Sequence, residues 1–158
     1  AYDISESFAP FSIIWQKFVQ HAQKHSHKKG ITIHIEDPNT LPDAIFEGNL
    51  LLRSLGAILE NSLKFCTRQE QIIISLDIDD DEIHIALRDN GRRIMDEYHD
   101  VLTQHSGQYT ARMSGSRASL ALNLPFANAV AGYLGGYLSI TSDDEWSFFT
   151  LHLPHSKQ

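Results

Sequence analysis

Two hydrophobic periodicities follow one another along this chain, and their order constrains its fold more than any other feature. Apolar residues recur at helical spacing in three segments, which are 7–29, 47–66 and 121–134. Five shorter segments have the composition of β-strands, and these are 31–36, 71–79, 82–89, 137–142 and 147–153. The sequence therefore predicts an α/β fold, a two-layer sandwich with one mixed, mostly antiparallel sheet of about five strands and three main helices on one face.

Glycine and proline residues mark the expected ends of these segments. Gly30 follows the first helical segment and is expected to end it. Pro125 lacks a backbone N–H and so belongs in a first helical turn, which places the start of the third helix at 121–124. Gly135 and Gly136 are expected to end that helix.

Composition narrows the class of protein. The chain has 158 residues, 42% of them hydrophobic, which is enough for one domain with an ordinary core. Its single cysteine, Cys66, excludes an internal disulfide and suits a reducing compartment. The sequence contains neither a signal peptide nor an apolar run of the roughly 20 residues that span a bilayer, and its formal net charge of −7 disfavours nucleic-acid binding. We therefore expect a cytoplasmic domain that contacts neither membrane nor nucleic acid.

Asn61 and Lys64 are the first candidates for chemistry, because their spacing of three residues places them on one face of the second helix. An amide oxygen is a suitable ligand for Mg²⁺, and an ammonium group neutralises phosphate oxygens. The same pair is also typical of a solvated helix face, and the two residues by themselves favour that alternative.

A second candidate lies where a predicted strand ends at Asp89, with Gly91 two residues later. A buried carboxylate in this position can accept a hydrogen bond from an adenine amino group, and a glycine lets the base pack against bare backbone. The alternative is an ordinary turn after a strand. The third candidate is the segment 119–125 at the start of the third helix, since helix N-termini attract anions, although this segment has no glycine.

Taken in order, these pieces resemble the ATP-binding catalytic domain of sensor histidine kinases, which has the Bergerat fold, over residues 8–154. ENSLKF at 60–65 resembles the E-N-A-x-K-F box of that family, and EGNLL at 47–51 resembles its D-P-x-x-L element. DNGRRI at 89–94 resembles the D-x-G-x-G-I box. Residues 121–142 resemble the G-L-G-L-A-I loop with the helix, the Gly-Gly pair and the strand that follow it.

The resemblance implies a domain that binds ATP or ADP with Mg²⁺ and passes the γ-phosphoryl group to a histidine on a separate dimerisation domain. It implies a two-component system with a response regulator as a further partner, and a cytoplasmic location that can include the cytoplasmic part of a membrane-bound sensor. By the same resemblance Asn61 holds Mg²⁺, Lys64 contacts phosphate, and Asp89 with Gly91 receives adenine.

The resemblance also implies boundaries within the chain. Residues 7–154 are expected to form the ATP-binding domain, with an ATP lid at 95–118. Residues 1–6 are then a linker, and residues 155–158 a tail.

The sequence departs from the family at the nucleotide site. Ala57 stands where the family usually has a second asparagine and where ATP-hydrolysing relatives have a glutamate base, which argues against ATP hydrolysis. Family glycines are replaced at Arg93, Ser119, Ala121, Asn123 and Trp146. A side chain at a position that needs positive φ costs on the order of 1 kcal/mol. Arg93 is expected either to offer its guanidinium to phosphate in place of a backbone amide or to pair with the acidic turn 79–82.

Three further interpretations remain open. The glycine losses favour a non-enzymatic domain that has lost nucleotide binding and docks a response regulator or a partner kinase. An anti-sigma-type serine kinase has the same fold, but no residue here favours it specifically. His21 and His25 have a spacing compatible with metal binding and His27 is near, yet an exposed helix face is the better interpretation, since no cysteine or carboxylate completes the set.

Overall fold

The computed structural model describes residues 7–26, 30–38, 40–66, 69–91 and 116–155. Its main feature is a five-stranded sheet in the order β2-β4-β5-β7-β6. The strands are β2 (Thr32–Glu36), β4 (Gln71–Ile78), β5 (Glu82–Asp89), β6 (Tyr137–Ser142) and β7 (Ser147–Pro154). Strands β2 and β4 are parallel and the other neighbours are antiparallel, so the predicted mixed sheet is confirmed.

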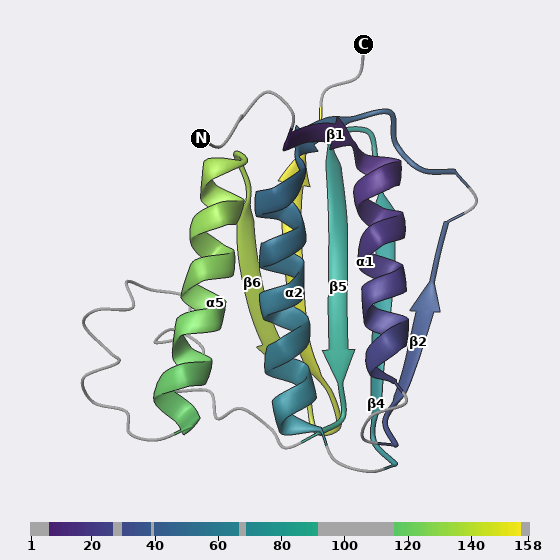
Figure 1. Cartoon of the computed structure of the whole chain (residues 1–158). Helices are drawn as coiled ribbons and strands as arrows, with labels where there is room; N and C mark the ends of the chain where they lie inside the picture. The colour runs from purple at the N-terminus through teal and green to yellow at the C-terminus, as the bar shows by residue number, and fades with distance from the viewer. Residues whose placement is uncertain (1–6, 27–29, 39, 67–68, 92–115, 156–158) are drawn as a thin grey trace.

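Three helices lie side by side on one face of this sheet (Figure 1), as the sequence predicts: α1 (Phe11–His25), α2 (Gly48–Phe65) and α5 (Ser116–Tyr133). Every second residue of these strands is buried beneath the helices, as Ile83, Ile85 and Leu87 of β5 show, while the residues between them stay partly exposed. Full burial of one such side chain stabilises the folded state by about 1.5–3 kcal/mol. No helix in the described ranges is both long and apolar enough to cross a membrane.

The expected first helix is wrong at its start. Residues Phe8–Pro10 form a strand, β1, that pairs with β3 (Ile45–Glu47) in a separate two-stranded ribbon. Pro10 has φ −59° and ψ 144°, an extended conformation, and a proline also disfavours helical geometry in the residue before it. Helix α1 therefore begins at Phe11, and the expected helical segment 27–29 lies outside the described residues.

The expected start of the third helix is also wrong. Helix α5 begins at Ser116, so Pro125 lies inside it rather than in its first turn. A proline removes one backbone hydrogen bond and crowds the carbonyl four residues earlier, which costs about 3 kcal/mol or more in a helix interior. The residues before it are mostly good helix formers, and the helix continues through this local defect.

The Gly-Gly pair ends α5 as expected. Gly135 has φ 90°, a left-handed conformation that favours glycine, and the N–H of Gly136 donates to the carbonyl of Ala131 at 2.7 Å. A Cβ atom at Gly136 would overlap the carbonyl oxygen of His152 on β7. The absence of a side chain at this position therefore lets β6 start close against β7.

Candidate functional site

Helix α2 places Asn61 in the interior. The helix begins where the side chain of Glu47 accepts a hydrogen bond from the N–H of Leu50 at 2.7 Å, which caps one free amide of the first turn. Asn61 is 0% exposed, and among the described residues neither polar atom of its side chain has a hydrogen-bond partner. An unpartnered buried polar group costs about 1–3 kcal/mol. The interpretation of Asn61 as part of a solvated helix face is therefore wrong.

Strand β5 ends on Asp89, which is 2% exposed. One carboxylate oxygen accepts a hydrogen bond from the N–H of Gly91 at 3.1 Å, and within the described ranges the other oxygen has no partner. Burial raises the pKa of the Asp89 carboxyl group to about 6; Glu70 adds to this rise, while Ser62 and the Gly91 amide oppose it. Above this pH the side chain is a buried anion, and one of its carboxylate oxygens makes no hydrogen bond of good geometry in the described part of the chain.

Two buried serines complete this polar group, and neither is among the residues that the sequence motifs predict. Ser62 follows Asn61 on α2, and its hydroxyl group lies near the Asp89 carboxylate and lowers the pKa of that group. Ser147 lies directly opposite Asp89 in the β5–β7 register. Both are buried, and in the described part of the chain neither hydroxyl has a hydrogen bond of good geometry. We call Asn61, Ser62, Asp89 and Ser147 the covered cluster. The position of Ser147 beside Trp146, in the segment aligned with a family glycine, was the one available signal in the sequence.

Lys64 lies near the C-terminal end of the same helix but on its surface. Its ammonium group is 3.4 Å from a carboxylate oxygen of Glu60, and both side chains are substantially exposed. An exposed pair at this spacing is weak, so the ammonium group can exchange partners at little cost. The structure thus places Asn61 in the interior and an exposed positive charge about one helical turn further along.

The remaining candidates are placed only in part. Gly91 lies beside Asp89, as its hydrogen bond shows. Arg93 lies outside the described residues, as does most of the expected lid at 95–118. Ala121 and Asn123 lie on α5, and their side chains are outside the described part.

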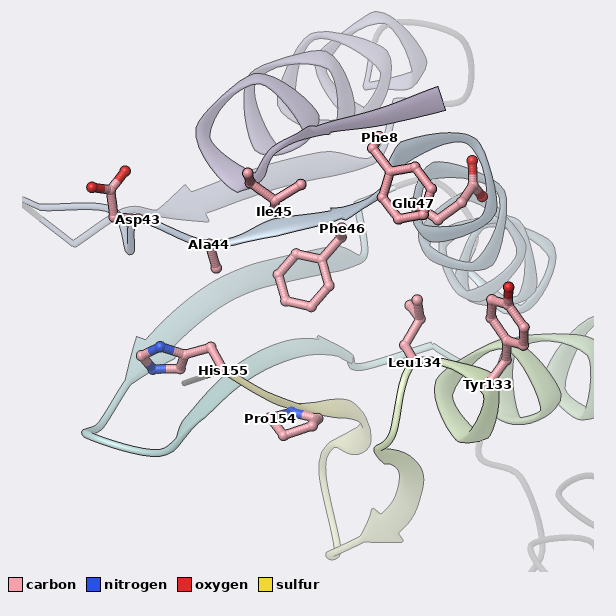
Figure 2. Close-up of a pocket in the computed structure, with 10 residues that line it drawn as sticks. All are labelled: Phe8, Asp43, Ala44, Ile45, Phe46, Glu47, Tyr133, Leu134, Pro154 and His155. Carbon is pink, nitrogen blue, oxygen red and sulfur yellow. The ribbon is translucent and has the colours of Figure 1, made fainter. Parts of the chain in front are cut away.

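A separate hollow of about 520 Å³ lies at the opposite end of the sheet (Figure 2). Its lining includes Phe46, Leu134 and Pro154. Because Pro154 pairs with Glu82 at the start of β5, whereas Asp89 ends that strand, this hollow and the covered cluster are at opposite ends of the same strands. The hollow is therefore not part of the candidate site.

Residues 47–157 match the protein family described as histidine kinase-, DNA gyrase B-, and HSP90-like ATPase. The match spans more than half of the chain and includes all four residues of the covered cluster. The chain belongs to this family, which binds nucleotides. No curated protein matches the sequence closely enough to count as a relative.

Solved structures agree with this fold. The catalytic domain of the histidine kinase ThkA, in a nucleotide-free form, has a TM-score of 0.78 at 13% identity, covering 95% of this chain and 99% of that one. The mycobacterial sensor histidine kinase MprB has a TM-score of 0.73 at 16% identity, with 96% and 98% covered. The histidine kinase AdeS of Acinetobacter baumannii has a TM-score of 0.70 at 15% identity, with 95% and 67% covered. The predicted Bergerat-type fold is thereby confirmed.

Proposed function

We propose that this domain binds Mg-ATP and supports transfer of the γ-phosphoryl group to a histidine on a separate dimerisation domain. The observation that carries the proposal is the covered cluster, in which Asn61 and Asp89 are buried with polar atoms that have no partner in the described part of the chain. Buried polar groups in native proteins are nearly always satisfied, so a group of such exceptions beside one another supports a bound ligand, ion or water at this place. The proposed wider setting is a two-component system in which a response regulator receives the phosphoryl group.

The donor set fits a magnesium nucleotide. The amide oxygen of Asn61 has no competing partner and is a hard oxygen ligand of the kind that Mg²⁺ accepts. The free carboxylate oxygen of Asp89 suits the amino group of adenine, with Gly91 beside the base. Lys64 would leave its weak pair with Glu60 and contact phosphate. Bound Mg²⁺ supplies neutralisation of the charge on the phosphate oxygens.

Phosphoryl transfer of this kind requires positioning and charge neutralisation more than acid–base groups. Ala57, one helical turn before Asn61, supplies no general base, which favours transfer to a protein acceptor over hydrolysis by water. Family glycines are lost on the phosphate side. There we propose that the Arg93 guanidinium replaces backbone amides and that Ala121 and Asn123 face the nucleotide.

The unit that binds is proposed to be residues 7–154, with 95–118 as the lid over the nucleotide, 1–6 as a linker and 155–158 as a tail. A cytoplasmic location, alone or as part of a membrane-bound sensor, is the setting in which ATP is available to it.

Calorimetric titration of the chain with ATP and ADP, with and without Mg²⁺, tests this function directly. We expect micromolar binding that requires Mg²⁺. Absence of binding at millimolar nucleotide would contradict the proposal and would favour the non-enzymatic alternative, a domain that docks a response regulator or a partner kinase. If binding is found, addition of a histidine-bearing dimerisation domain and detection of phosphohistidine test the transfer step.

A further inference from the structure

The open face of the sheet carries a pair of histidines that belongs to neither the covered cluster nor the hollow. His84 on β5 and His152 on β7 are direct cross-strand partners. Their Nδ1 atoms lie 2.9 Å apart, and their rings are nearly perpendicular, at 84°. Two neutral imidazoles that present lone pairs to each other at this distance repel, so the gap between them requires either one proton or one metal ion.

The outer nitrogen of each ring has its own partner. Nε2 of His152 lies 2.8 Å from the hydroxyl oxygen of Ser139, and Nε2 of His84 lies 3.3 Å from a carboxylate oxygen of Asp79. When Nε2–H donates to such an oxygen, the lone pair is on Nδ1, which is the tautomer that a metal requires. Metal-binding histidines almost always have this outer hydrogen bond to a carboxylate or another oxygen.

The supporting groups are themselves held in place. One carboxylate oxygen of Asp79 accepts hydrogen bonds from the N–H groups of Asp81 and Glu82, at 2.9 and 2.7 Å, which leaves the other for His84. The ring of Tyr137 stacks on that of His152, with centroids 4.3 Å apart and planes 10° from parallel. Both imidazoles are thus oriented before any ligand arrives.

A carboxylate supplies a third ligand. Glu82 is two residues before His84 on β5, so it projects from the same face of the sheet. One candidate ligand atom from each of Glu82, His84 and His152 lies within 4.8 Å of the other two. Zinc–nitrogen bonds of 2.0–2.1 Å at a tetrahedral angle hold two nitrogens about 3.3 Å apart. The two rings therefore need to separate by only a few tenths of an ångström.

We propose that Glu82, His84 and His152 form a binding site for a borderline divalent transition metal, with Zn²⁺ as the representative ion. Two imidazoles and one carboxylate are one of the known ligand sets of three-ligand zinc sites, in which a water completes the tetrahedron. We call these three residues with Asp79 and Ser139 the open-face cluster. The ligand set differs from the oxygen donors that suit Mg²⁺.

The site is independent of the proposed function. His84 and Asp89 are five residues apart on one strand, about 17 Å at strand spacing, and they project from opposite faces of the sheet. Metal binding here can therefore be tested with no nucleotide present.

The test is a titration of the whole chain with Zn²⁺ alone against a competing chelator, followed by Co²⁺ to read the ligands from its absorption spectrum. We expect one ion per chain. His84→Gln and His152→Gln should each weaken binding at least 30-fold, and Asp79→Asn, which removes only an outer hydrogen bond, by about tenfold. Zinc should also raise the thermal unfolding midpoint of the parent but not of the two histidine variants.

The matched control is His21→Gln. His21 and His25 form another histidine pair, on α1, with ring centroids 4.7 Å apart, but no third ligand is grouped with them in the described part of the chain. Zinc affinity should be unchanged in this variant. Loss of binding in His21→Gln, or parental affinity in His84→Gln, would overturn the proposal, as would no binding at all, which would leave a proton shared by His84 and His152. If either glutamine variant fails to fold, Glu82→Gln provides the same comparison, with an expected loss of at least tenfold.

Discussion

Two polar clusters occupy the two faces of the same strands, and they are organised in opposite ways. In the covered cluster, beneath the helices, side-chain atoms of Asn61, Ser62, Asp89 and Ser147 have no partner among the described residues. In the open-face cluster, every ring nitrogen of His84 and His152 has one. The more deeply buried cluster is thus the less satisfied one, which is the reverse of what stability alone would produce.

Under the proposed function, the difference reflects which of the two clusters takes a ligand. Each unpartnered buried group costs about 1–3 kcal/mol, and the folded chain carries several of them around Asp89. The proposed nucleotide and Mg²⁺ would supply the missing partners. In the open-face cluster the outer ring nitrogens have partners in Ser139 and Asp79. A metal ion there would therefore replace only the one proton between the two imidazole rings.

The largest effect is expected from Asp89→Asn, which removes the buried charge of the covered cluster. The free energy of unfolding should be higher in the variant than in the parent by up to about 3 kcal/mol at pH 7. The reason is that a pKa raised from 3.8 to about 6 corresponds to about this cost of burying the Asp89 charge, and asparagine carries no charge. Mg-ATP affinity should fall at the same time. Urea unfolding measures the first quantity and calorimetry the second.

The raised pKa of Asp89 also predicts how the free energy of unfolding changes with pH. Between pH 3.8 and about 6 the folded protein keeps a proton on Asp89 that the unfolded chain has lost, so the free energy of unfolding falls as pH rises through this window. Below pH 3.8 this cost is absent, and above about 6 it is complete. Asp89→Asn should flatten the profile, whereas Asp77→Asn, an exposed carboxylate on β4, should not. If Asp89→Asn and the parent have identical pH profiles, the pKa of Asp89 is not raised in the folded protein.

The second-largest effect on stability is expected from Gly136→Ala, which disturbs the backbone of β7 beside His152 in the open-face cluster. Gly136→Ala should lower the free energy of unfolding by about 2 kcal/mol, because the added methyl group meets the carbonyl of His152 and has no flexible atom to displace. It should also move β6 and weaken zinc binding while the affinity for nucleotide stays near that of the parent. As a control, Gly132→Ala adds a methyl group to α5 where no atom lies within 4 Å, and it should be neutral or slightly stabilising.

A matched pair of asparagines sharpens the contrast between partnered and unpartnered groups. Asn61→Leu should leave stability unchanged or raise it by about 1 kcal/mol, because it removes polar atoms that make no hydrogen bond in the described structure. Asn128→Leu should lower stability by a similar amount, because the side-chain oxygen of Asn128 accepts from the N–H of Leu138 at 3.1 Å. Only Asn61→Leu should abolish Mg-ATP binding. If both variants lose stability equally, Asn61 has a structural partner and the magnesium role is wrong.

Periodicity predicted most of the fold because alternation and helical spacing are local properties of the sequence. All five strands of the main sheet and all three helices are where apolar spacing puts them, with differences at their ends. The wrong helix starts expected near Pro10 and Pro125 show that local sequence does not determine where an element begins. Proline is tolerated in a first helical turn and costs about 3 kcal/mol or more in a helix interior. The chain nevertheless forms strand β1 up to Pro10 and continues helix α5 through Pro125, so tertiary packing decides the outcome at both places.

The candidate site could be predicted from the sequence only where a family motif indicated it. The boxes around Asn61 and Asp89 indicated nucleotide chemistry, but burial and the missing hydrogen bonds depend on how α2 packs on β5. Ser147 and the pair of His84 with His152 could not be found from spacing, because they are defined by the β5–β7 register, and its two strands are separated by more than fifty residues.

The smallest effect on stability is expected at the edge of the covered cluster. Lys64→Met should change the free energy of unfolding by less than about 0.5 kcal/mol, because its ion pair with Glu60 is exposed. It should nevertheless weaken Mg-ATP binding and make the remaining affinity less sensitive to salt, since a charge that contacts phosphate is lost. Glu60→Gln removes the same ion pair but frees the ammonium group, so its nucleotide affinity should equal or exceed that of the parent. Equal losses in the two variants would mean that the ion pair orders the helix end, and that Lys64 does not contact the nucleotide.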